Sequence, residues 1–527
     1  MNKTQVKKNM VRNTIFSFFL MVTILCAESV IVTVNHDQTL LTSQFKIGTT
    51  HTHGFWEYGH NKAVNRARDL LIDGIAFQNQ HIMGWGVGNP EPQPGNYQWN
   101  DLDHRVELMR DIGTPMSITF CQAPGWMKGT GDWEMQQEVL DEHVDDFAEL
   151  CQKVADRYPD VKYVQIWNEL KGYWSTTLNN WDYIRYTDMY NTVYEAVKSV
   201  RPDALIGGPY IVIQGDGAVE IGKTGRDTYV PLGGRDRTFL RYWLKNKAGA
   251  DFICMDYGLI DYHDPNSYTH DEKMQLTRFW GKWIRDIRAM TDLPIVISEF
   301  YGGADNSDRE FTAANHASCY IQALINGASL ALQWNPEQGE LENYLFTDTE
   351  SSDGGQPTPH YDVVKAINDH FSAGTDILET TSSSEWIDVV ASGQKTMLVN
   401  KKDGPVSVQV NSTAIDLDRY EVRVIDTPAE SNVNNNSQKA NRSQIEIQQT
   451  VTGALIRLIP SRSAQVTVSL YNLLGQQVSS FEQSVTRRTV SIIRPFKNVS
   501  CASGVYIIQV KGLEQPLVRT IRFTCNP

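Results

Sequence analysis

The sequence predicts an α/β fold: a (β/α)8 TIM barrel with an accessory β-sandwich and a C-terminal all-β module. Three observations support this prediction: a regular series of apolar runs, helical patterns between the runs, and a change to short alternating segments further along the chain. The runs are rich in β-branched residues and fall within residues 44–372, and there are eight of them: Phe45–Thr49, His81–Gly86, Pro115–Phe120, Tyr163–Asn168, Ala204–Pro209, Asp251–Tyr257, Pro294–Glu299 and Ser329–Trp334. Strands that alternate with helices form parallel sheets, and eight such units close into a barrel.

The segments between the runs place apolar residues at helical spacing. Glu138–Arg157 and Trp181–Val200 show this pattern, and Tyr361–Phe371 would complete the eighth unit. The alternative fold is a doubly wound open sheet, which requires a glycine-rich phosphate-binding turn after its first strand. Residues 48–54, Gly-Thr-Thr-His-Thr-His-Gly, do not form such a turn. We therefore expect the closed barrel.

Beyond the barrel, the chain changes to short segments in which apolar and polar residues alternate. Trp386–Ala391, Thr396–Asn400 and Val406–Val410 have this pattern, which is typical of half-buried antiparallel strands. Val30–Val34, ahead of the barrel, has the same character. Residues 28–43 and 373–427 together are therefore predicted to form the accessory β-sandwich.

The C-terminal module follows a polar stretch, residues 428–442, that has no apolar periodicity and is predicted to be a linker. Residues 443–527 contain no His, no Trp and no paired carboxylates. Their β-rich segments are Val466–Tyr471, Val490–Ile493, Val505–Val510 and Val518–Phe523. This composition indicates a non-catalytic β-sandwich.

The N-terminus has the pattern of an export signal. Lys3, Lys7, Lys8 and Arg12 form a basic region, and Ile15–Ala27 is an apolar stretch of the length expected for a signal peptide. A helix that spans a membrane needs ~20 apolar residues, and this run is shorter. We therefore expect residues 1–27 to be a cleaved signal peptide, the mature protein to be secreted or held at the cell surface, and no membrane span.

Charge is distributed unevenly along the chain. The whole sequence has a net charge of −14, whereas residues 443–527 carry nine Lys or Arg against three Asp or Glu. The leader is also basic, so residues 28–442 are strongly acidic. A domain of this charge repels nucleic acid and anionic membranes, and we expect neither as a partner. The charge argues more weakly against a sulfated or uronate-rich polymer as substrate.

The spacing of the cysteines matches no zinc-binding or disulfide framework. Four cysteines are scattered through the main domain, where we expect buried free thiols: Cys121, Cys151, Cys254 and Cys319. Cys501 and Cys525 lie close to the C-terminus and could pair in an exported protein.

Two strand ends carry the residues with catalytic chemistry. In a (β/α)8 enzyme the active site forms where the C-terminal ends of the strands meet. The fourth run ends in Gln-Ile-Trp-Asn-Glu at Glu169, and the seventh ends in Ile-Val-Ile-Ser-Glu at Glu299. A single Glu in such a position is common, but a pair on facing strands indicates a function.

Two facing carboxyl groups are what the cleavage of a glycosidic bond requires, because one donates a proton to the leaving oxygen while the other attacks the anomeric carbon. Carboxyl groups about 5–5.5 Å apart give retention of configuration, whereas a wider spacing admits a water molecule and gives inversion. The fourth and seventh strands can provide the shorter spacing. As the acid, Glu169 would need a raised pKa, which we expect apolar Trp167 and Trp174 and repulsion from Glu299 to supply.

These residues resemble the active-site motifs of the clan A glycoside hydrolases: Asn168-Glu169 after the fourth strand, Glu299 at the end of the seventh and Trp334 at the end of the eighth. Over residues 44–372 the chain is most similar to family 39 of that clan, the β-xylosidase and iduronidase group. The segments that carry this similarity are Trp167–Trp174, Ile297–Phe300, Gly207–Pro209 and Pro359–Tyr361.

The resemblance implies that Glu169 is the acid/base, that Glu299 is the nucleophile and that Asn168 contacts the 2-hydroxyl group of the sugar. Leu170 is a departure, because many relatives have Pro directly after the acid/base. This departure leaves the chemistry unchanged and concerns only the assignment to one family of the clan.

Loop residues on the same side of the barrel are further candidates for substrate binding. His51, His53 and Trp56 follow the first strand and Trp85 follows the second. His51 and His53 have the sequence spacing of a metal-binding pair, but no third residue of a ligand type follows at a spacing typical of zinc sites. We therefore expect no metal and no cofactor.

Aromatic residues complete this candidate set. Tyr257 could orient the nucleophile, Trp334 is expected to form a platform beneath the sugar, and Trp174 to line the substrate site, because indole rings stack on the apolar faces of sugars. All 13 Trp lie between Trp56 and Trp386, a clustering that a large hydrophobic core would also produce.

The C-terminal module has its own resemblance. Val468–Val478, which reads VSLYNLLGQQV, and Ser503–Tyr506, which reads SGVY, are similar to the type IX secretion sorting domain of Bacteroidetes. The resemblance implies that this module is an export address recognised by the secretion machinery. A carbohydrate-binding β-sandwich is the alternative, and the absence of Trp argues against it.

Together these features predict a secreted retaining glycoside hydrolase that acts on β-linked plant or algal glycans, with an oligo- or polysaccharide as its substrate. An endo-acting polysaccharidase of the same clan, similar to an agarase or porphyranase, is one alternative. An open cleft lined by Trp126, Trp133 and Trp174 would favour it, whereas a pocket closed by residues 214–234 would favour exo action. The other alternative is a catalytically inactive glycan-binding protein, which would not need both carboxyl groups.

Overall fold

The computed structural model describes residues 29–50, 58–213, 232–258, 268–305, 307–339, 344–429, 444–450, 453–459, 463–472, 476–486, 491–493, 504–511 and 517–523. The chain divides into two compact units, Met1–Glu430 and Ser431–Pro527. The predicted signal peptide and residues 430–442 of the predicted linker lie outside the described residues, and the finer domain boundaries remain predictions.

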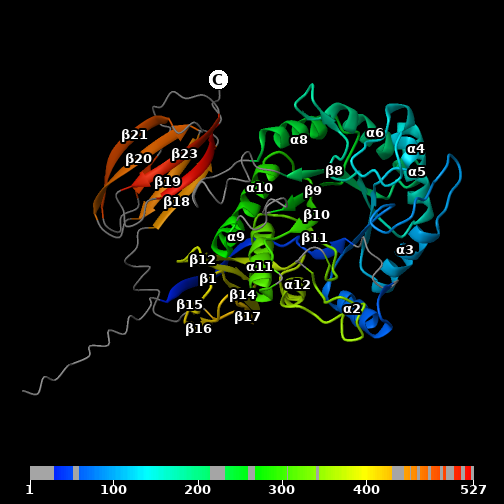
Figure 1. Cartoon of the computed structure of the whole chain (residues 1–527). Coiled ribbons are helices and arrows are strands. Elements are labelled where there is room, and N and C mark those ends of the chain that lie inside the picture. The colour runs from blue at the N-terminus through cyan, green and yellow to red at the C-terminus, as the bar shows by residue number, and fades with distance from the viewer. Residues whose placement is uncertain are drawn as a thin grey trace, which may run out of the picture. The chain divides into compact units, whose positions relative to one another are not determined.

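The first unit contains a closed barrel of eight parallel strands (Figure 1). In chain order the strands are β2 (Ile47–Thr50), β3 (Gln78–His81), β4 (Met116–Phe120), β5 (Tyr163–Ile166), β8 (Leu205–Ile213), β9 (Phe252–Gly258), β10 (Ile295–Tyr301) and β11 (Leu330–Trp334). Each strand pairs with the next in sequence, and β11 pairs with β2 to close the ring. The predicted (β/α)8 fold is confirmed.

Helices surround the barrel, as Figure 1 shows, and in the described part of the chain one or two α-helices follow each strand in sequence. The principal helices are α2 (Asn61–Gly74), α3 (Asn100–Ile112), α5 (Val144–Arg157), α6 (Tyr183–Val200), α8 (Gly234–Asn246), α9 (His270–Leu276), α10 (Arg278–Arg288), α11 (Arg309–Ile325) and α12 (Pro359–His370). None of the helices in the described ranges combines the length and apolar composition needed to cross a membrane.

The prediction for the second strand was wrong: the strand is Gln78–His81, whereas the sequence pattern favoured His81–Gly86. The strand was missed because its four residues are polar, although all four are buried. The side-chain amides of this strand form hydrogen bonds in place of the apolar contacts of an ordinary buried strand. Gln78 donates to the carbonyl of Met109 at 2.9 Å, and Asn79 accepts from Ser117 at 2.6 Å.

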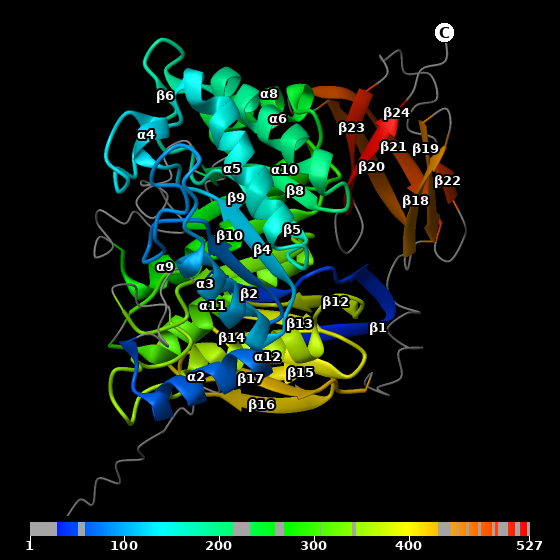
Figure 2. The same ribbon diagram turned by 90° about the vertical axis from the view of Figure 1, so that its right-hand side faces the viewer.

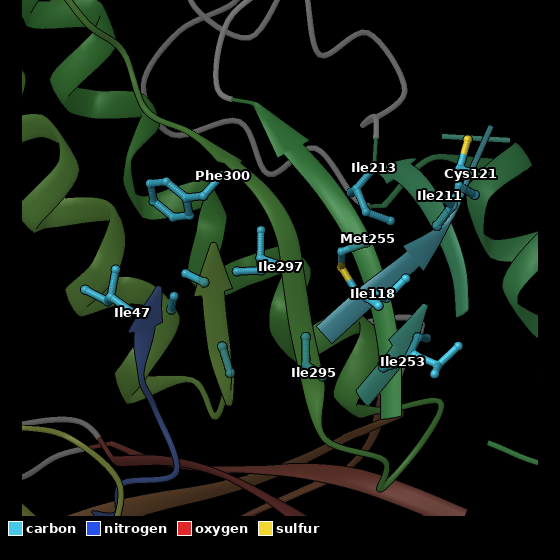
Figure 3. Packing of buried hydrophobic residues seen from close by; sticks show 14 of the residues in the cluster. Ile47, Ile118, Cys121, Ile211, Ile213, Ile253, Met255, Ile295, Ile297 and Phe300 are labelled. Atoms are coloured by element: carbon cyan, nitrogen blue, oxygen red, sulfur yellow. The ribbon is translucent and has the colours of Figure 1, made fainter. Parts of the chain in front are cut away.

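Alternation along the strands divides the apolar residues between two cores. On β9, Ile253 and Met255 belong to the core between barrel and helices, part of which Figure 3 shows. Phe252 and Cys254 belong to a second cluster inside the barrel, together with Val296 and Leu332. Because side chains on a strand point alternately to its two faces, the residue after Met255 must face the barrel interior.

The accessory strands form two sheets. The first has the order β12-β1-β15-β16 and the second β13-β14-β17. The strands are β1 (Val30–Thr42), β12 (Asp376–Ser382), β13 (Ile387–Ala391), β14 (Lys395–Asn400), β15 (Val406–Val410), β16 (Thr413–Leu417) and β17 (Val422–Asp426). Val32, Val34, Leu398 and Val408 are among the buried residues that both sheets contribute to a separate core.

These sheets lie beside α11 and α12, as Figure 2 shows. At this contact Ser318 of α11 donates to Asp388 of β13, and Lys401 forms an ion pair with the same carboxylate at 3.3 Å. A buried ion pair of this kind contributes to a specific arrangement more reliably than to stability.

The second unit is all β. One sheet has the order β18-β19-β22 and the other β21-β20-β23-β24. The strands are β18 (Gln444–Thr450), β19 (Gly453–Ile459), β20 (Ala464–Asn472), β21 (Gln477–Val485), β22 (Ser491–Ile493), β23 (Gly504–Lys511) and β24 (Leu517–Phe523). Cys501 and Cys525 lie outside the described residues, so their predicted pairing stays a prediction, whereas Cys121, Cys151, Cys254 and Cys319 are buried free thiols as expected.

Candidate active site

Glu299 reaches the barrel interior through an irregularity in β10. The pairing registers of β10 with β9 and with β11 both shift around Ser298 and Glu299. Strict alternation would place Ser298 and Glu299 on opposite faces, but a β-bulge re-aims a side chain. Ser298 donates to Gln165 of β5, and Glu299 contacts residues from two other strand ends. Both residues therefore face inward.

Three donors hold the carboxyl group of Glu299, which is only 3% exposed. The Tyr210 hydroxyl and the Asn168 amide donate to Oε1 at 3.0 and 3.2 Å, and the Tyr301 hydroxyl donates to Oε2 at 2.5 Å. Tyr210 comes from β8 and Asn168 from the end of β5. Hydrogen bonds donated to a carboxyl group favour its ionised form.

Glu169 lies in a tight loop that follows β5. Trp167, Glu169 and Leu170 have positive φ angles of 70, 51 and 53°, an uncommon conformation for residues with side chains. The Trp167 indole donates to the carbonyl of Lys171 at 2.9 Å, and the Lys171 amide donates to the carbonyl of Asn168 at 3.1 Å. This loop folds back on itself, and the Lys171 ammonium forms an ion pair with the Glu169 carboxylate.

A third carboxyl group, on Asp256 of β9, completes the cluster. Asp256 is the register partner of Glu299 and follows Phe252 and Cys254 on the inward face of the strand. One carboxyl oxygen from each of Glu169, Asp256 and Glu299 lies within 4.8 Å of the other two. The expected carboxyl pair is thus together, with an acidic residue that the sequence analysis had missed.

The electrostatics of this cluster differ from the expectation for Glu169. Burial raises the pKa of Glu169, but the Lys171 charge and hydrogen bonds to Asp256 and Lys171 outweigh it, and the net shift is downward. Trp167 does not line the carboxyl group, because its ring packs on Phe147 and Tyr173 with centroids 5.6 and 6.0 Å away.

The other two carboxyl groups have the opposite shift. Burial and then repulsion from Glu169 raise the pKa of Glu299 to about 8. Burial, together with repulsion from Glu299 and Glu169, also raises the pKa of Asp256 far above its ordinary value. The free site therefore retains protons on these carboxyl groups at a pH where isolated carboxyl groups have lost them.

An aromatic wall lies beside the carboxyl groups. Trp334, which is buried, meets Trp85 edge to face with centroids 5.9 Å apart, and His81 lies 4.4 Å from Trp85 and 6.1 Å from Trp334. The Lys171 ammonium stands 5.3 Å from the centre of the Trp85 ring. Trp85 and Trp334 thus lie beside His81, which contacts Asn168, and Trp85 also lies beside Lys171; their binding of substrate stays a prediction.

His81 is a further residue that the sequence analysis did not select. Its Nε2 lies 3.3 Å from the Asn168 amide nitrogen, which places it in contact with a residue that also binds Glu299. Burial and the Lys171 charge lower the pKa of His81 to about 3, so the ring is neutral. Its Nδ1 and the Oδ1 of Asn168 are buried without a hydrogen bond from the described residues. These atoms are suited to bind hydroxyl groups of a ligand.

The remaining predicted residues are placed as follows. His51, His53 and Trp56 lie outside the described residues. The backbone of Tyr257 pairs with Phe300, but its side chain is not described. Tyr210 and Tyr301 make the hydrogen bonds to the nucleophile candidate that had been expected of Tyr257.

Trp174 lies on a small hairpin formed by β6 (Trp174–Ser175) and β7 (Asn180–Trp181). It is 48% exposed, and its ring lies 5.1 Å from the guanidinium of Arg235 and 6.0 Å from the Trp181 ring. An exposed indole does not supply the buried apolar surroundings that Glu169 was expected to have, so the predicted effect of Trp174 on that pKa was wrong.

The spacing of Glu169, Asp256 and Glu299 would in principle allow a divalent cation to bind, and theirs is the only group of three or more potential ligands found among the described residues. Lys171 already provides a positive charge at Glu169 and would repel a metal ion. The cluster is better matched to acid/base chemistry, in which neighbouring carboxyl groups with separated pKa values exchange protons.

Comparisons with known proteins agree on the fold alone. No model of a known protein family matches the chain, and no curated protein matches it. Among solved structures, SrfJ from Salmonella typhimurium has a TM-score of 0.54 and 12% sequence identity, over 77% of this chain and 94% of that one. A conserved exported protein from Bacteroides fragilis has a TM-score of 0.53 and 12% identity, over 88% and 99% of the two chains. The endo-β1,6-glucanase BT3312 has a TM-score of 0.50 and 12% identity, over 76% and 94%.

Proposed function

We propose that the chain is a retaining glycoside hydrolase of the clan A type that cleaves β-linked plant or algal glycans. The observation that carries this proposal is the carboxyl pair at the ends of the fourth and seventh barrel strands, with oxygens of Glu169 and Glu299 within 4.8 Å of each other. A spacing of ~5 Å is typical of retaining enzymes, whereas inverting enzymes need ~6.5–9.5 Å to accommodate water.

In the proposed mechanism Glu299 is the nucleophile. The donors Tyr210, Asn168 and Tyr301 hold its carboxylate in place and stabilise the charge needed for attack on the anomeric carbon. Glu169 donates a proton to the leaving oxygen and then, as a base, accepts one from the water that releases the sugar. Trp334 and Trp85 provide flat apolar surfaces for the sugar ring.

An endo-acting polysaccharidase is the second candidate within this proposal. Trp133 and Trp174 are 59% and 48% exposed, and exposed indoles can bind several units of a long glycan. One similar structure is described as an endo-β1,6-glucanase. Release of a single short product from the end of the glycan would indicate exo action. A mixture of oligosaccharide lengths would indicate endo action.

The test is a screen of the purified protein against aryl β-glycosides and polysaccharides, with the configuration of the first product followed by NMR. We expect hydrolysis with retention. Glu299→Gln should abolish it, whereas Glu142→Gln, which changes an exposed carboxylate, should not. Binding of a glycan without hydrolysis would favour the glycan-binding alternative, and an inverted product would contradict the retaining mechanism.

We also propose that residues 1–27 and 443–527 direct export, so that the protein is secreted or held at the cell surface by a Bacteroidetes-like bacterium. The resemblance of the C-terminal module to type IX sorting domains supports this part of the proposal. A chain that ends at Arg442 should keep its hydrolytic activity and lose export in the native host. Loss of activity with unchanged secretion would reverse the assignment.

A further inference from the structure

Asp256 is the one carboxyl group of the cluster that no donor among the described residues stabilises. Glu299 accepts from Tyr210, Asn168 and Tyr301, and Glu169 is paired with Lys171. Neither oxygen of Asp256 receives a hydrogen bond from the part of the chain that the structure describes, although the side chain is only 2% exposed. A buried carboxylate in this situation is unstable.

The groups that face Asp256 explain which form it takes. Glu169 approaches from the loop after β5, Glu299 from β10 and Tyr210 from β8, and Lys171 is the positive charge nearby. Three carboxylates and one ammonium would leave two uncompensated negative charges in a buried space, which is unfavourable. A proton on one carboxyl group relieves this repulsion, and Asp256 loses the least by accepting it because it has no donors to give up.

The contact between Asp256 and Glu169 is consistent with this distribution. One carboxyl oxygen of Asp256 lies within 4.8 Å of one of Glu169, but two carboxylates have only acceptor atoms, so they repel each other and form no hydrogen bond. A bond exists only when one of them carries a proton. Lys171 favours the ionised form of Glu169, so Asp256 is the donor.

We propose that Asp256 is a carboxylic acid in the resting enzyme and stores the proton that Glu169 delivers to the leaving group. This inference rests on the proposed glycosidase function and extends it, since it makes Asp256 a positioning residue that acts through Glu169. It also explains how Glu169 can donate a proton although Lys171 and Asp256 together hold it as a carboxylate before substrate binds.

One proton moves from Asp256 through Glu169 to the leaving group, and one returns by the same route. As the bond between the anomeric carbon and the leaving oxygen breaks, the oxygen keeps the electron pair and takes a proton from Glu169, which takes the proton of Asp256. A bond forms between Glu299 and the anomeric carbon. In the second half, a water oxygen bonds to that carbon while the Glu299 bond breaks and returns its electron pair to the carboxylate. The water proton passes through Glu169 back to Asp256.

The first test measures the proton directly and needs no substrate. Infrared spectra of the full-length protein at pH 7 should contain a carboxylic acid carbonyl band that is weaker in Asp256→Asn by the contribution of one carboxyl group, because Glu299 also retains a proton at this pH. Met255→Leu is the matched control, because Met255 is the neighbouring residue on β9 and faces the outer core; its spectrum should equal that of the wild type. Wild-type and Asp256→Asn spectra with equal carboxylic acid intensity would overturn the proposal, whether or not the protein hydrolyses any glycoside.

The second test uses activity. Asn has nearly the shape of Asp and still donates to Glu169, but it has no proton to give. For glycosides with poor leaving groups, kcat/KM of Asp256→Asn should fall by ~10²-fold, the range of general acid assistance. Activated aryl glycosides should lose little activity in the glycosylation step. An equal loss for both substrate types would mean that Asp256 is merely structural and would overturn the proposal.

Discussion

The two carboxyl groups at the barrel mouth are positioned by different kinds of structure. Glu299 lies within a strand, where a bulge turns it inward and neutral donors surround it, Tyr301 from the same strand and Tyr210 from β8. Glu169 lies in a loop of positive φ angles whose own Lys171 turns back to neutralise it. The pKa of Glu299 is raised to about 8, whereas that of Glu169 is lowered.

This difference shows that the charge of a buried carboxyl group follows from its partners more than from its position on the barrel. Burial acts on both groups in the same direction, since both are removed from water. An ammonium in direct contact reverses the effect at Glu169, because a charge in contact outweighs neutral dipoles of hydroxyl and amide donors. The predictions below test the contrast between the two sites.

The largest expected effect is that of Glu299→Ala. In the proposed mechanism it removes the atom that bonds to the anomeric carbon, so kcat should fall by at least ~10⁴-fold for every substrate, whatever its leaving group. Steady-state kinetics on aryl glycosides with a series of leaving groups would measure this. Activity that survives with activated leaving groups would show that Glu299 is not the nucleophile.

Glu169→Ala should have a smaller and more selective effect. Proton donation contributes ~10²–10⁴-fold, so substrates with poor leaving groups should lose that much while glycosylation by activated aryl glycosides is largely spared. Added azide should speed turnover of the trapped intermediate and give the β-azide as product. A β-azide from Glu299→Ala, together with an inverted α-azide from Glu169→Ala, would mean that the two roles are exchanged.

The raised pKa of Glu299 should also appear as a stability difference. Its pKa in the folded state is about 8 against an ordinary 4.5, so the folded protein keeps a proton that the unfolded chain has lost. Stability should therefore fall as the pH rises from 4.5 to 8. Glu299→Gln cannot ionise and therefore avoids this loss. Relative to the wild type, its stability should rise by a few kcal/mol between low pH and pH values above 8, at ~1.4 kcal/mol for each unit of pKa shift.

Urea unfolding at pH 5 and pH 9 measures this difference, and only its change with pH matters, because the amide also alters the hydrogen bonds from the two tyrosines. The exposed residue provides the control: Glu142→Gln should show no change with pH. A constant difference between wild type and Glu299→Gln at both pH values would contradict the raised pKa.

The smallest expected effect is a shift of the pH profile in Lys171→Met. The Lys171 charge lowers the pKa of both Glu169 and Glu299, so its removal should raise both. Because Glu299 must be ionised to attack, the acidic limb of kcat/KM should move to higher pH, with about a tenfold loss for each pKa unit below it. Lys153→Met, a change at a lysine on α5, should leave the limb in place, and an unmoved limb in Lys171→Met would contradict the assignment.

Some parts of the site could be predicted because they depend on short patterns. Glu299 follows an apolar strand, and Asn168-Glu169 follows another, so the eightfold alternation alone placed them at one end of the barrel. Trp334 was predicted for the same reason, and in the structure it lies beside Trp85 and His81.

Other residues were missed because their roles depend on register or backbone turns. Asp256 lies one position before the residue that was selected, Tyr257, and alternation from Phe252 and Cys254 would have identified it as inward-facing. Tyr210 lies within β8, which ends at Ile213, four residues beyond the predicted end at Pro209. His81 was assigned to the start of a strand that in fact ends there, because Gln78, Asn79 and Gln80 do not have the apolar pattern of a strand.

The sequence by itself determined the barrel, the chain order of its strands and the presence of two carboxyl groups at one end, because apolar periodicity dictates which segments must be buried and parallel strands end together. Only the tertiary structure decided which carboxyl groups are charged. That property depends on distances of a few ångströms between Lys171, Asp256 and the two glutamates, which come from separate strand ends. Electrostatic interactions at such distances in a buried site are strong and change sign with the partner, and no local pattern encodes them.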